Sequence, residues 1–129
     1  MTFDLPLNDV SIEFLIDSGA SCNIITVKDY EKVKEWVSLK PCNKRLYPYG
    51  VKIPLQIRGE FAGKIESPSK KMCIEANFIV VEKNDVIDSN LLGADTAIAL
   101  NMLRIGEDVN QINSCTFNNP SDKYSDLKL

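Results

Sequence analysis

The chain has 129 residues, 44% of them hydrophobic and 26% charged, with a formal net charge of −3 and a sequence pI of about 5.0. This length and composition fit one globular domain. A mildly acidic chain lacks the cationic surface for sequence-independent nucleic-acid binding. No apolar run reaches the roughly 20 residues of a membrane span, and the N-terminal stretch MTFDLPLND has no basic segment of a secretory signal. We therefore expect no nucleic-acid partner, no membrane partner and a cytoplasmic location.

The absence of histidine restricts the possible chemistry. It excludes Ser-His-Asp and Cys-His nucleophilic sites and the usual His-containing zinc sites. The four cysteines are scattered singly with no CxxC pair, so neither a zinc ribbon nor a disulfide framework is expected. We expect no metal and no cofactor, and acid–base chemistry would fall to carboxylates, Lys or Tyr.

The first predicted strand covers residues 10–16, where apolar and polar residues alternate before the run becomes continuously apolar. A turn of small residues follows, and residues 23–25 predict a second short strand. Thr26 and Asp29 have the spacing of a capping box, which predicts a short helix over residues 27–36.

The middle of the chain contains a loop and a predicted hairpin. Residues 41–48 have a loop-like composition with a basic pair. Residues 51–67 alternate on both sides of Gly59, which predicts a hairpin with its turn near that glycine, and Pro54 indicates an edge strand. After a turn at SPSKK, residues 72–83 predict a longer strand.

The C-terminal part contains the strongest helix signal. NDVIDSN predicts a turn, NLLG a short apolar step in which the glycine lets the backbone pass close to another segment, and residues 94–103 a helix. Residues 104–113 predict a final strand, which completes a domain over residues 1–113. The polar residues 114–129 predict a flexible tail or linker. Many short strands with two helices place the chain in the all-β class.

An acid stands directly behind an apolar strand in the stretch FLIDSGAS. Asp-Ser-Gly is good turn chemistry, and the triplet alone fits an ordinary turn aspartate. Such a turn does not need a continuous apolar approach, and a buried carboxylate is costly unless it is compensated. The stretch VIDSN is an internal control, because it lacks the glycine and follows charged residues, so we interpret Asp88 as a surface-turn residue. These differences make Asp17 the candidate catalytic carboxylate.

FLIDSGASCNII resembles the active-site segment of retropepsins, the aspartic proteases of retroviruses and long-terminal-repeat retrotransposons. Leu91-Leu92-Gly93 followed by a helix resembles the second hallmark of the family. LYPYGVKIPLQIRGEF lies where the family has its flap hairpin, and its Tyr-Gly-x-x-x-Pro-Leu pattern is most similar to gypsy-type retroelement proteases. The resemblance covers residues 10–106, and the order and spacing of the motifs make it specific.

The resemblance implies an all-β half-barrel with one C-terminal helix and a flap hairpin, active as a homodimer. Peptide hydrolysis by this route needs two carboxylates that share one proton, because like charges so close cannot both ionise. One chain offers one Asp-Ser-Gly, so each subunit would contribute its Asp17 at the two-fold axis. The resemblance also implies that the Ser18 hydroxyl bonds to the partner loop and that Gly19 lets the substrate backbone approach closely.

The implied flap spans residues 47–55 and would fold over an extended peptide. The substrate-binding residues predicted from this arrangement are Ala20, Tyr49, Gly50 and Val51. For Tyr49, an ordinary exposed aromatic is the alternative. The flap departs from the glycine-rich viral tip, because Gly50 stands alone between prolines. The family often has an Arg after the Leu-Leu-Gly step, next to an acidic residue. In this chain Ala94 stands between Gly93 and Asp95, so that Arg is missing.

These patterns predict a homodimeric aspartic endopeptidase that binds polypeptide in extended form and cuts a retroelement polyprotein, its own flanks included. We expect it in the cytoplasm, including retroelement particles. Two alternatives stay open: a retropepsin-like domain of a cellular protein, and a catalytically silent dimerisation or peptide-binding module. The intact Asp-Ser-Gly-Ala favours an enzyme.

Overall fold

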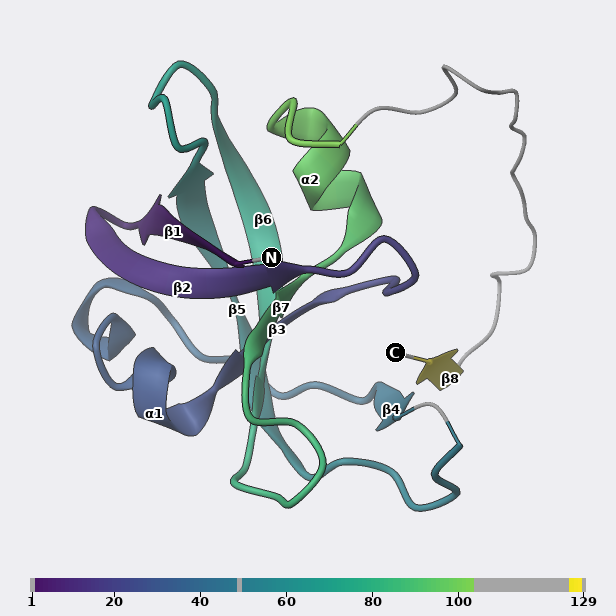
Figure 1. Ribbon diagram of the computed structural model, residues 1–129. Helices are drawn as coiled ribbons and strands as arrows, with labels where there is room; N and C mark the ends of the chain where they lie inside the picture. The colour runs from purple at the N-terminus through teal and green to yellow at the C-terminus, as the bar shows by residue number, and fades with distance from the viewer. Residues whose placement is uncertain (1, 49, 104–125, 129) are drawn as a thin grey trace.

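The computed structural model of the chain describes residues 2–48, 50–103 and 126–128. Six strands form a closed barrel in the order β1-β2-β7-β3-β6-β5, and a separate two-stranded sheet joins β4 to β8 (Figure 1). The barrel strands are β1 (Thr2–Leu7), β2 (Val10–Ile16), β3 (Asn23–Thr26), β5 (Ile57–Glu66), β6 (Cys73–Val81) and β7 (Asn90–Leu92). The predicted all-β class is confirmed.

Strand β1 has no counterpart among the predicted strands, because Asp4 and Pro6 interrupt its apolar pattern. It nonetheless pairs antiparallel with β2 along its whole length. Leu5 and Leu7 point into the core with no exposed surface. Leu7 also pairs with Ile65 of β5, and this contact closes the barrel.

The hairpin predicted over residues 51–67 is wrong in its position. Gly59 lies inside β5, and the hairpin instead joins β5 to β6 through a turn at residues 67–72. A Cβ at Gly59 would lie 2.6 Å from the Lys40 carbonyl oxygen. Lys40 and Glu60 exchange two backbone hydrogen bonds at this crossing, with N···O distances of 2.8 and 2.9 Å. The glycine therefore marks a close approach of two segments rather than a turn.

The helices are shorter than predicted. The helix expected over residues 27–36 is divided into α1 (Val27–Tyr30) and a 3-10 turn, η1 (Lys34–Trp36), and α2 covers Ala94–Ala99 instead of residues 94–103. α2 stops just before Asn101, whose φ of 61° lies in the left-handed region that ends many helices, and the Met102 N–H donates to the Ala97 carbonyl oxygen at 2.8 Å.

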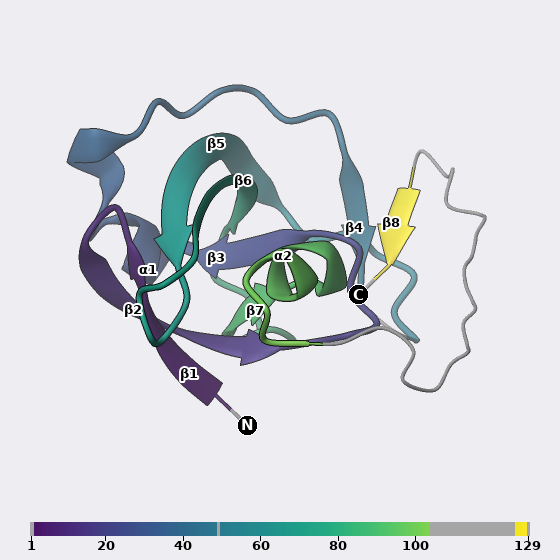
Figure 2. The same cartoon turned by 90° about the horizontal axis from the view of Figure 1, so that it is seen from above.

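The strand predicted over residues 104–113 lies outside the described residues. Within the predicted tail, Asp126–Lys128 form β8, which pairs in parallel with β4 (Arg45–Tyr47). Figure 2 shows these two short strands side by side next to the barrel. Three residues of the expected tail are therefore extended and paired.

Two apolar clusters hold the fold together. In the barrel, the Phe78 ring centroid lies 5.8 Å from that of Phe14 and 5.5 Å from that of Phe61, and all three rings are buried. Such aromatic contacts add to the free energy of burial. A second cluster packs Leu46 and Leu55 against the wall formed by β3, β6 and β7. The segment around β4 is thus anchored by two leucines.

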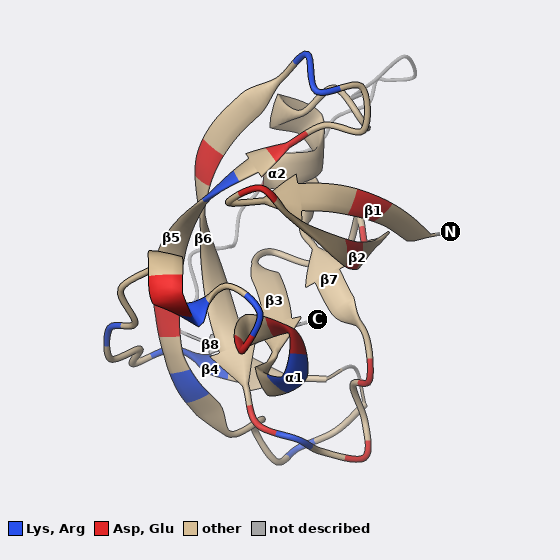
Figure 3. Cartoon of the chain, turned by 90° about the vertical axis from the view of Figure 1, so that its left-hand side faces the viewer, with Lys and Arg blue, Asp and Glu red and all other residues tan. Residues whose placement is uncertain are grey.

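The outer surface carries charges of both signs. In the view of Figure 3, basic and acidic residues are interspersed over β5, α1 and the connecting loops. In the ranges given above, none of the helices has the length and apolar character needed to cross a membrane.

Candidate active site

The turn after β2 holds the predicted catalytic carboxylate. β2 ends at Ile16, and the Asp17 N–H donates to the Leu92 carbonyl oxygen of β7 at 3.0 Å. The Ala20 N–H closes the turn onto the Asp17 carbonyl oxygen at 3.0 Å, and the Gly19 N–H donates to Asp17 Oδ1 at 3.0 Å. The turn of small residues therefore presents one backbone N–H, that of Gly19, to the carboxylate.

The four residues predicted at this turn lie together but differ in exposure. Asp17 is half-buried, Ser18 and Gly19 are exposed, and Ala20 is buried. A half-buried carboxylate beside an exposed glycine is accessible to a molecule from solution. The buried Ala20 anchors the other end of the turn in the barrel wall.

The Leu-Leu-Gly step packs directly against the turn. β7 runs parallel to β2, with Leu92 opposite Ile16. A Cβ at Gly93 would lie 2.9 Å from the Cys22 carbonyl oxygen and 3.2 Å from that of Ala20, so a larger residue does not fit. The close backbone passage predicted at this glycine is confirmed, and it ties the two sequence motifs into one structure.

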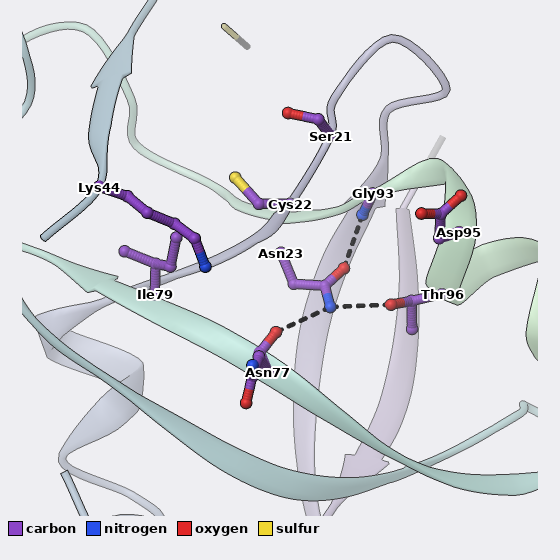
Figure 4. A pocket seen from close by; sticks show the side chains of 9 residues that line it. All are labelled: Ser21, Cys22, Asn23, Lys44, Asn77, Ile79, Gly93, Asp95 and Thr96. Carbon is purple, nitrogen blue, oxygen red and sulfur yellow. Dashed lines mark hydrogen bonds between the residues drawn. The ribbon is translucent and has the colours of Figure 1, made fainter. Parts of the chain in front are cut away.

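Asn23, which the sequence patterns did not single out, fixes the geometry behind the turn. Its Oδ1 accepts the Gly93 N–H at 2.8 Å, and its Nδ2 donates to Thr96 Oγ1 at 2.8 Å and to the Asn77 carbonyl oxygen at 2.9 Å (Figure 4). One buried amide thus joins β3, β6 and the start of α2. An asparagine directly before the apolar pair Ile24-Ile25 was the available signal, because a buried amide needs hydrogen-bond partners.

Asn90 plays a similar part at the other end of β7. Its Oδ1 accepts the Thr26 N–H at 2.8 Å and the Thr26 hydroxyl at 3.2 Å, and its Nδ2 donates to the Glu13 carbonyl oxygen at 2.8 Å and to Asp29 Oδ2 at 2.5 Å. The predicted capping box is wrong, since Thr26 makes no capping hydrogen bond and both of its residues bind Asn90 instead. Burial opposes ionisation of Asp29, but hydrogen bonds from Lys32 and Asn90 outweigh it and lower the pKa of Asp29.

A cavity of about 190 Å³ lies beyond the turn, between β3, β6 and α2 (Figure 4). Cys22, Lys44 and Asp95 contribute to its wall. Burial raises the pKa of Cys22 to about 11, and the nearby Lys44 opposes this rise. The thiol is therefore protonated at neutral pH and is a poor nucleophile. Asp17 remains the candidate for chemistry.

The segment after β4 corresponds to the predicted flap. The Leu46 carbonyl oxygen accepts the Leu55 N–H at 2.8 Å, and the Pro48 carbonyl oxygen accepts the Val51 N–H at 2.9 Å. Gly50 has a φ of 79°, in the left-handed region that favours glycine. The described returning arm forms no regular strand before β5, so this flap is a looped hairpin with few backbone bonds.

The predicted flap residues are not joined to the catalytic turn. Gly50 is exposed, Val51 is half-buried, and Tyr49 lies outside the described residues. The most exposed apolar side chain of the segment is Ile53, at 75%. Figures 1 and 2 place the flap segment and the β2–β3 loop on the same side of the barrel. Among the described residues, no hydrogen bond links the segment to the Asp17 turn.

A closed barrel whose Asp-Ser-Gly turn is braced by a Leu-Leu-Gly step has the retropepsin fold. The EIAV protease complexed with the inhibitor HBY-793 matches with a TM-score of 0.65 and 21% identity over 81% of this chain and 91% of that chain. The retroviral protease-like domain of Ddi1 from Leishmania major matches with a TM-score of 0.53 and 20% identity over 76% and 74% of the two chains. No family model and no curated protein matches the sequence. The retropepsin resemblance is confirmed for the fold, while the gypsy-type origin stays a prediction.

Proposed function

We propose that the chain is an aspartic endopeptidase that works as a homodimer. The observation that carries the proposal is the Asp17 turn: a half-buried carboxylate at the end of a barrel strand, bonded to the Gly19 N–H and locked against Gly93. A turn aspartate without chemical function does not require this bracing, and Asp88 in the comparable stretch is simply exposed.

The mechanism needs two carboxylates, and each subunit supplies one. An ionised Asp17 takes a proton from water as the water attacks the scissile carbonyl, and the protonated Asp17 of the partner subunit donates to the developing oxyanion. The exposed Ser18 hydroxyl is free to bond to the partner turn. The exposed Gly19 lets a peptide backbone approach the carboxylates.

The substrate is a polypeptide bound in extended form. Ala20 lines the floor of the site, and Tyr49, Gly50 and Val51 cover the peptide from the flap, so that strand edges and flap pair with its backbone. The Tyr-Gly-x-x-x-Pro-Leu flap pattern supports a gypsy-type retroelement polyprotein as the natural substrate. The site of action is then the cytoplasm, including retroelement particles. A retropepsin-like domain of a cellular protein is the second candidate, supported by the likeness to the Leishmania Ddi1 domain.

The proposal is tested by incubating the full chain with a mixed peptide library at acidic pH, with and without pepstatin. Pepstatin carries a hydroxyl that mimics the tetrahedral intermediate, so it binds a working carboxylate pair. We expect pepstatin-sensitive cleavage that falls by about 10²–10⁴-fold in Asp17→Asn. The matched control is Asp88→Asn, which makes the same change in an exposed Asp-Ser pair and leaves cleavage intact. Absence of cleavage by a folded dimer would assign the chain to a silent binding module.

Dimer dependence makes activity sensitive to concentration. Subunits diluted below their dissociation constant lose the second carboxylate, whereas assembly of a particle concentrates them. Specific activity measured over a dilution series should therefore fall as the dimer dissociates. A constant specific activity down to concentrations at which sedimentation shows only monomer would exclude a shared site.

A further inference from the structure

Strand β4 has two edges, and they have different partners. The Leu46 carbonyl oxygen accepts the Leu55 N–H at 2.8 Å, so the polar backbone groups of Leu46 face the returning arm of the flap. Along a strand, successive residues direct these groups to opposite edges. Arg45 and Tyr47 therefore present theirs to the outer edge, and β8 lies along that edge.

The pairing on the outer edge has a defined register. β8 runs parallel to β4, with Arg45 opposite Asp126, Leu46 opposite Leu127 and Tyr47 opposite Lys128. Both strands lie on the side of the barrel where the β2–β3 loop projects, and in Figure 1 β8 is drawn between that loop and the flap segment. The buried Leu46 side chain holds β4 in the second apolar cluster, so the edge is fixed in place.

We propose that the outer edge of β4 is a strand-docking edge and that its resident occupant is this chain's own segment Asp126–Lys128. An open strand edge offers unpaired N–H and C=O groups to any extended segment. The chain's own segment has the advantage of covalent attachment, which gives it an effective concentration of the order of mM.

One consequence rests on the proposed function. A peptide that pairs with the β4 edges of both subunits, on either side of the two-fold axis, runs parallel to one edge and antiparallel to the symmetry-related one. The parallel direction of β8 matches one half of such a peptide. Segment Asp126–Lys128 then competes with substrate for this edge, and the enzyme is restrained by its own chain.

The docking is tested by amide hydrogen exchange of the full chain, read residue by residue by NMR. The reporter is the Tyr47 N–H, which faces β8, and the reference is the Phe78 N–H inside the barrel. Leu127→Pro removes a backbone donor from β8 and breaks the pairing. Leu127→Ala keeps that donor and is the matched control. We expect Tyr47 exchange to accelerate by about tenfold or more in Leu127→Pro and to stay within about threefold in Leu127→Ala.

Each other outcome contradicts the proposal. A Tyr47 amide that exchanges equally in the unchanged chain and in Leu127→Pro has no partner in β8. Protection that disappears on dilution of the unchanged chain would make the occupant a second copy instead of the chain's own segment. An accelerated Phe78 amide would show that the barrel itself had opened, and the comparison then moves to a Lys128→Pro chain, in which the removed N–H faces away from β4. Tyr47 exchange as fast in Lys128→Pro as in Leu127→Pro then contradicts the docking.

The competition has a separate readout. If both proposals hold, Leu127→Pro lowers KM for peptide cleavage several-fold while kcat stays unchanged, because a competitor in the same chain has been removed. Cleavage with an unchanged KM contradicts the competition alone. Protection of Tyr47 without any cleavage contradicts the proposed function and leaves the docking in place.

Discussion

The wall around Asp17 and the flap segment on the same side of the barrel are held in contrasting ways. In the wall, Asn23 and Asn90 each make three or more side-chain hydrogen bonds, and Gly93 leaves no room for a Cβ. The flap segment is anchored by two buried leucines, and its tip exposes Ile53. A catalytic carboxylate needs a fixed position. A flap that opens to admit a peptide has to break its own hydrogen bonds, so it is expected to make few of them.

The sharpest test of this difference compares two glycines. Gly93→Val places a side chain 2.9 Å from the Cys22 carbonyl oxygen, a backbone atom that cannot move aside, so we expect a loss of about 3–5 kcal/mol in the free energy of unfolding. In Gly50→Ala the added Cβ has no atom within 4 Å. The only cost is the left-handed φ of residue 50, so we expect the free energy of unfolding to fall by about 1–2 kcal/mol. Urea unfolding measures both, and equal losses would contradict a rigid wall beside a loose flap.

The second test compares two asparagines. Asn90 is buried, and Asn90→Leu removes the hydrogen-bond partner of the Thr26 N–H and of the Glu13 carbonyl oxygen. We expect the free energy of unfolding to fall by about 2–4 kcal/mol. Asn84 also accepts two backbone N–H groups, at 2.7 Å each, but in a partly exposed loop where water replaces them. Asn84→Leu should therefore cost less than about 1 kcal/mol. A loss in Asn84→Leu as large as that in Asn90→Leu would mean that the loop bonds matter as much as the wall.

The third test stays within the flap segment. Leu55 is 9% exposed in the second apolar cluster, and Leu55→Ala should lower the free energy of unfolding by about 2 kcal/mol. Ile53 is 75% exposed, and Ile53→Ala should change it by less than about 0.5 kcal/mol. Thermal unfolding followed by circular dichroism separates the two. A stability loss at Ile53 would show that the tip is packed against a surface in solution.

The same contrast explains what the sequence could predict. The turn at Asp17 and the close passage at Gly93 follow from local patterns: an apolar strand that ends in small residues, and an apolar step that ends in glycine. Gly59 has an equally local signal, but its reason is the crossing by Lys40, which is distant in sequence, so the hairpin was misplaced.

Long-range partners also account for what was missed. The strand β1 is specified by pairing with β2 and β5 rather than by its own alternation. Asn23 and Asn90 are each followed by two apolar residues in sequence, and their hydrogen-bond partners lie 54 or more residues away. Pairing of β8 with β4 joins segments about eighty residues apart, and the sequence of neither segment predicts the other as its pairing partner.

The smallest effect tests how closely the two regions approach each other. Burial raises the pKa of Cys22, in the wall, to about 11 from a usual 9.0, and Lys44, just before β4, lowers it. Because the folded pKa is the higher one, the protonated thiol contributes stability that is complete below about pH 9 and is lost as pH rises towards 11 and beyond. Lys44→Ala should raise the pKa of Cys22 further, and Lys71→Ala, at the distant β5–β6 turn, should leave it unchanged.

Alkylation of Cys22 followed by mass spectrometry between pH 8 and 11 follows the thiolate fraction, since only the thiolate reacts, and this fraction falls at every pH in the range when the pKa of Cys22 rises. The exposed Cys73 in the same chain calibrates the rate of an accessible thiol. A rise in Lys44→Ala would establish that the segment before β4 lies over the wall in solution, so that only the flap tip is loosely held. An unchanged pKa of Cys22 would show that Lys44 does not lie over the wall in solution, so that the loosely held part of the chain would begin at Lys44 rather than at the flap tip.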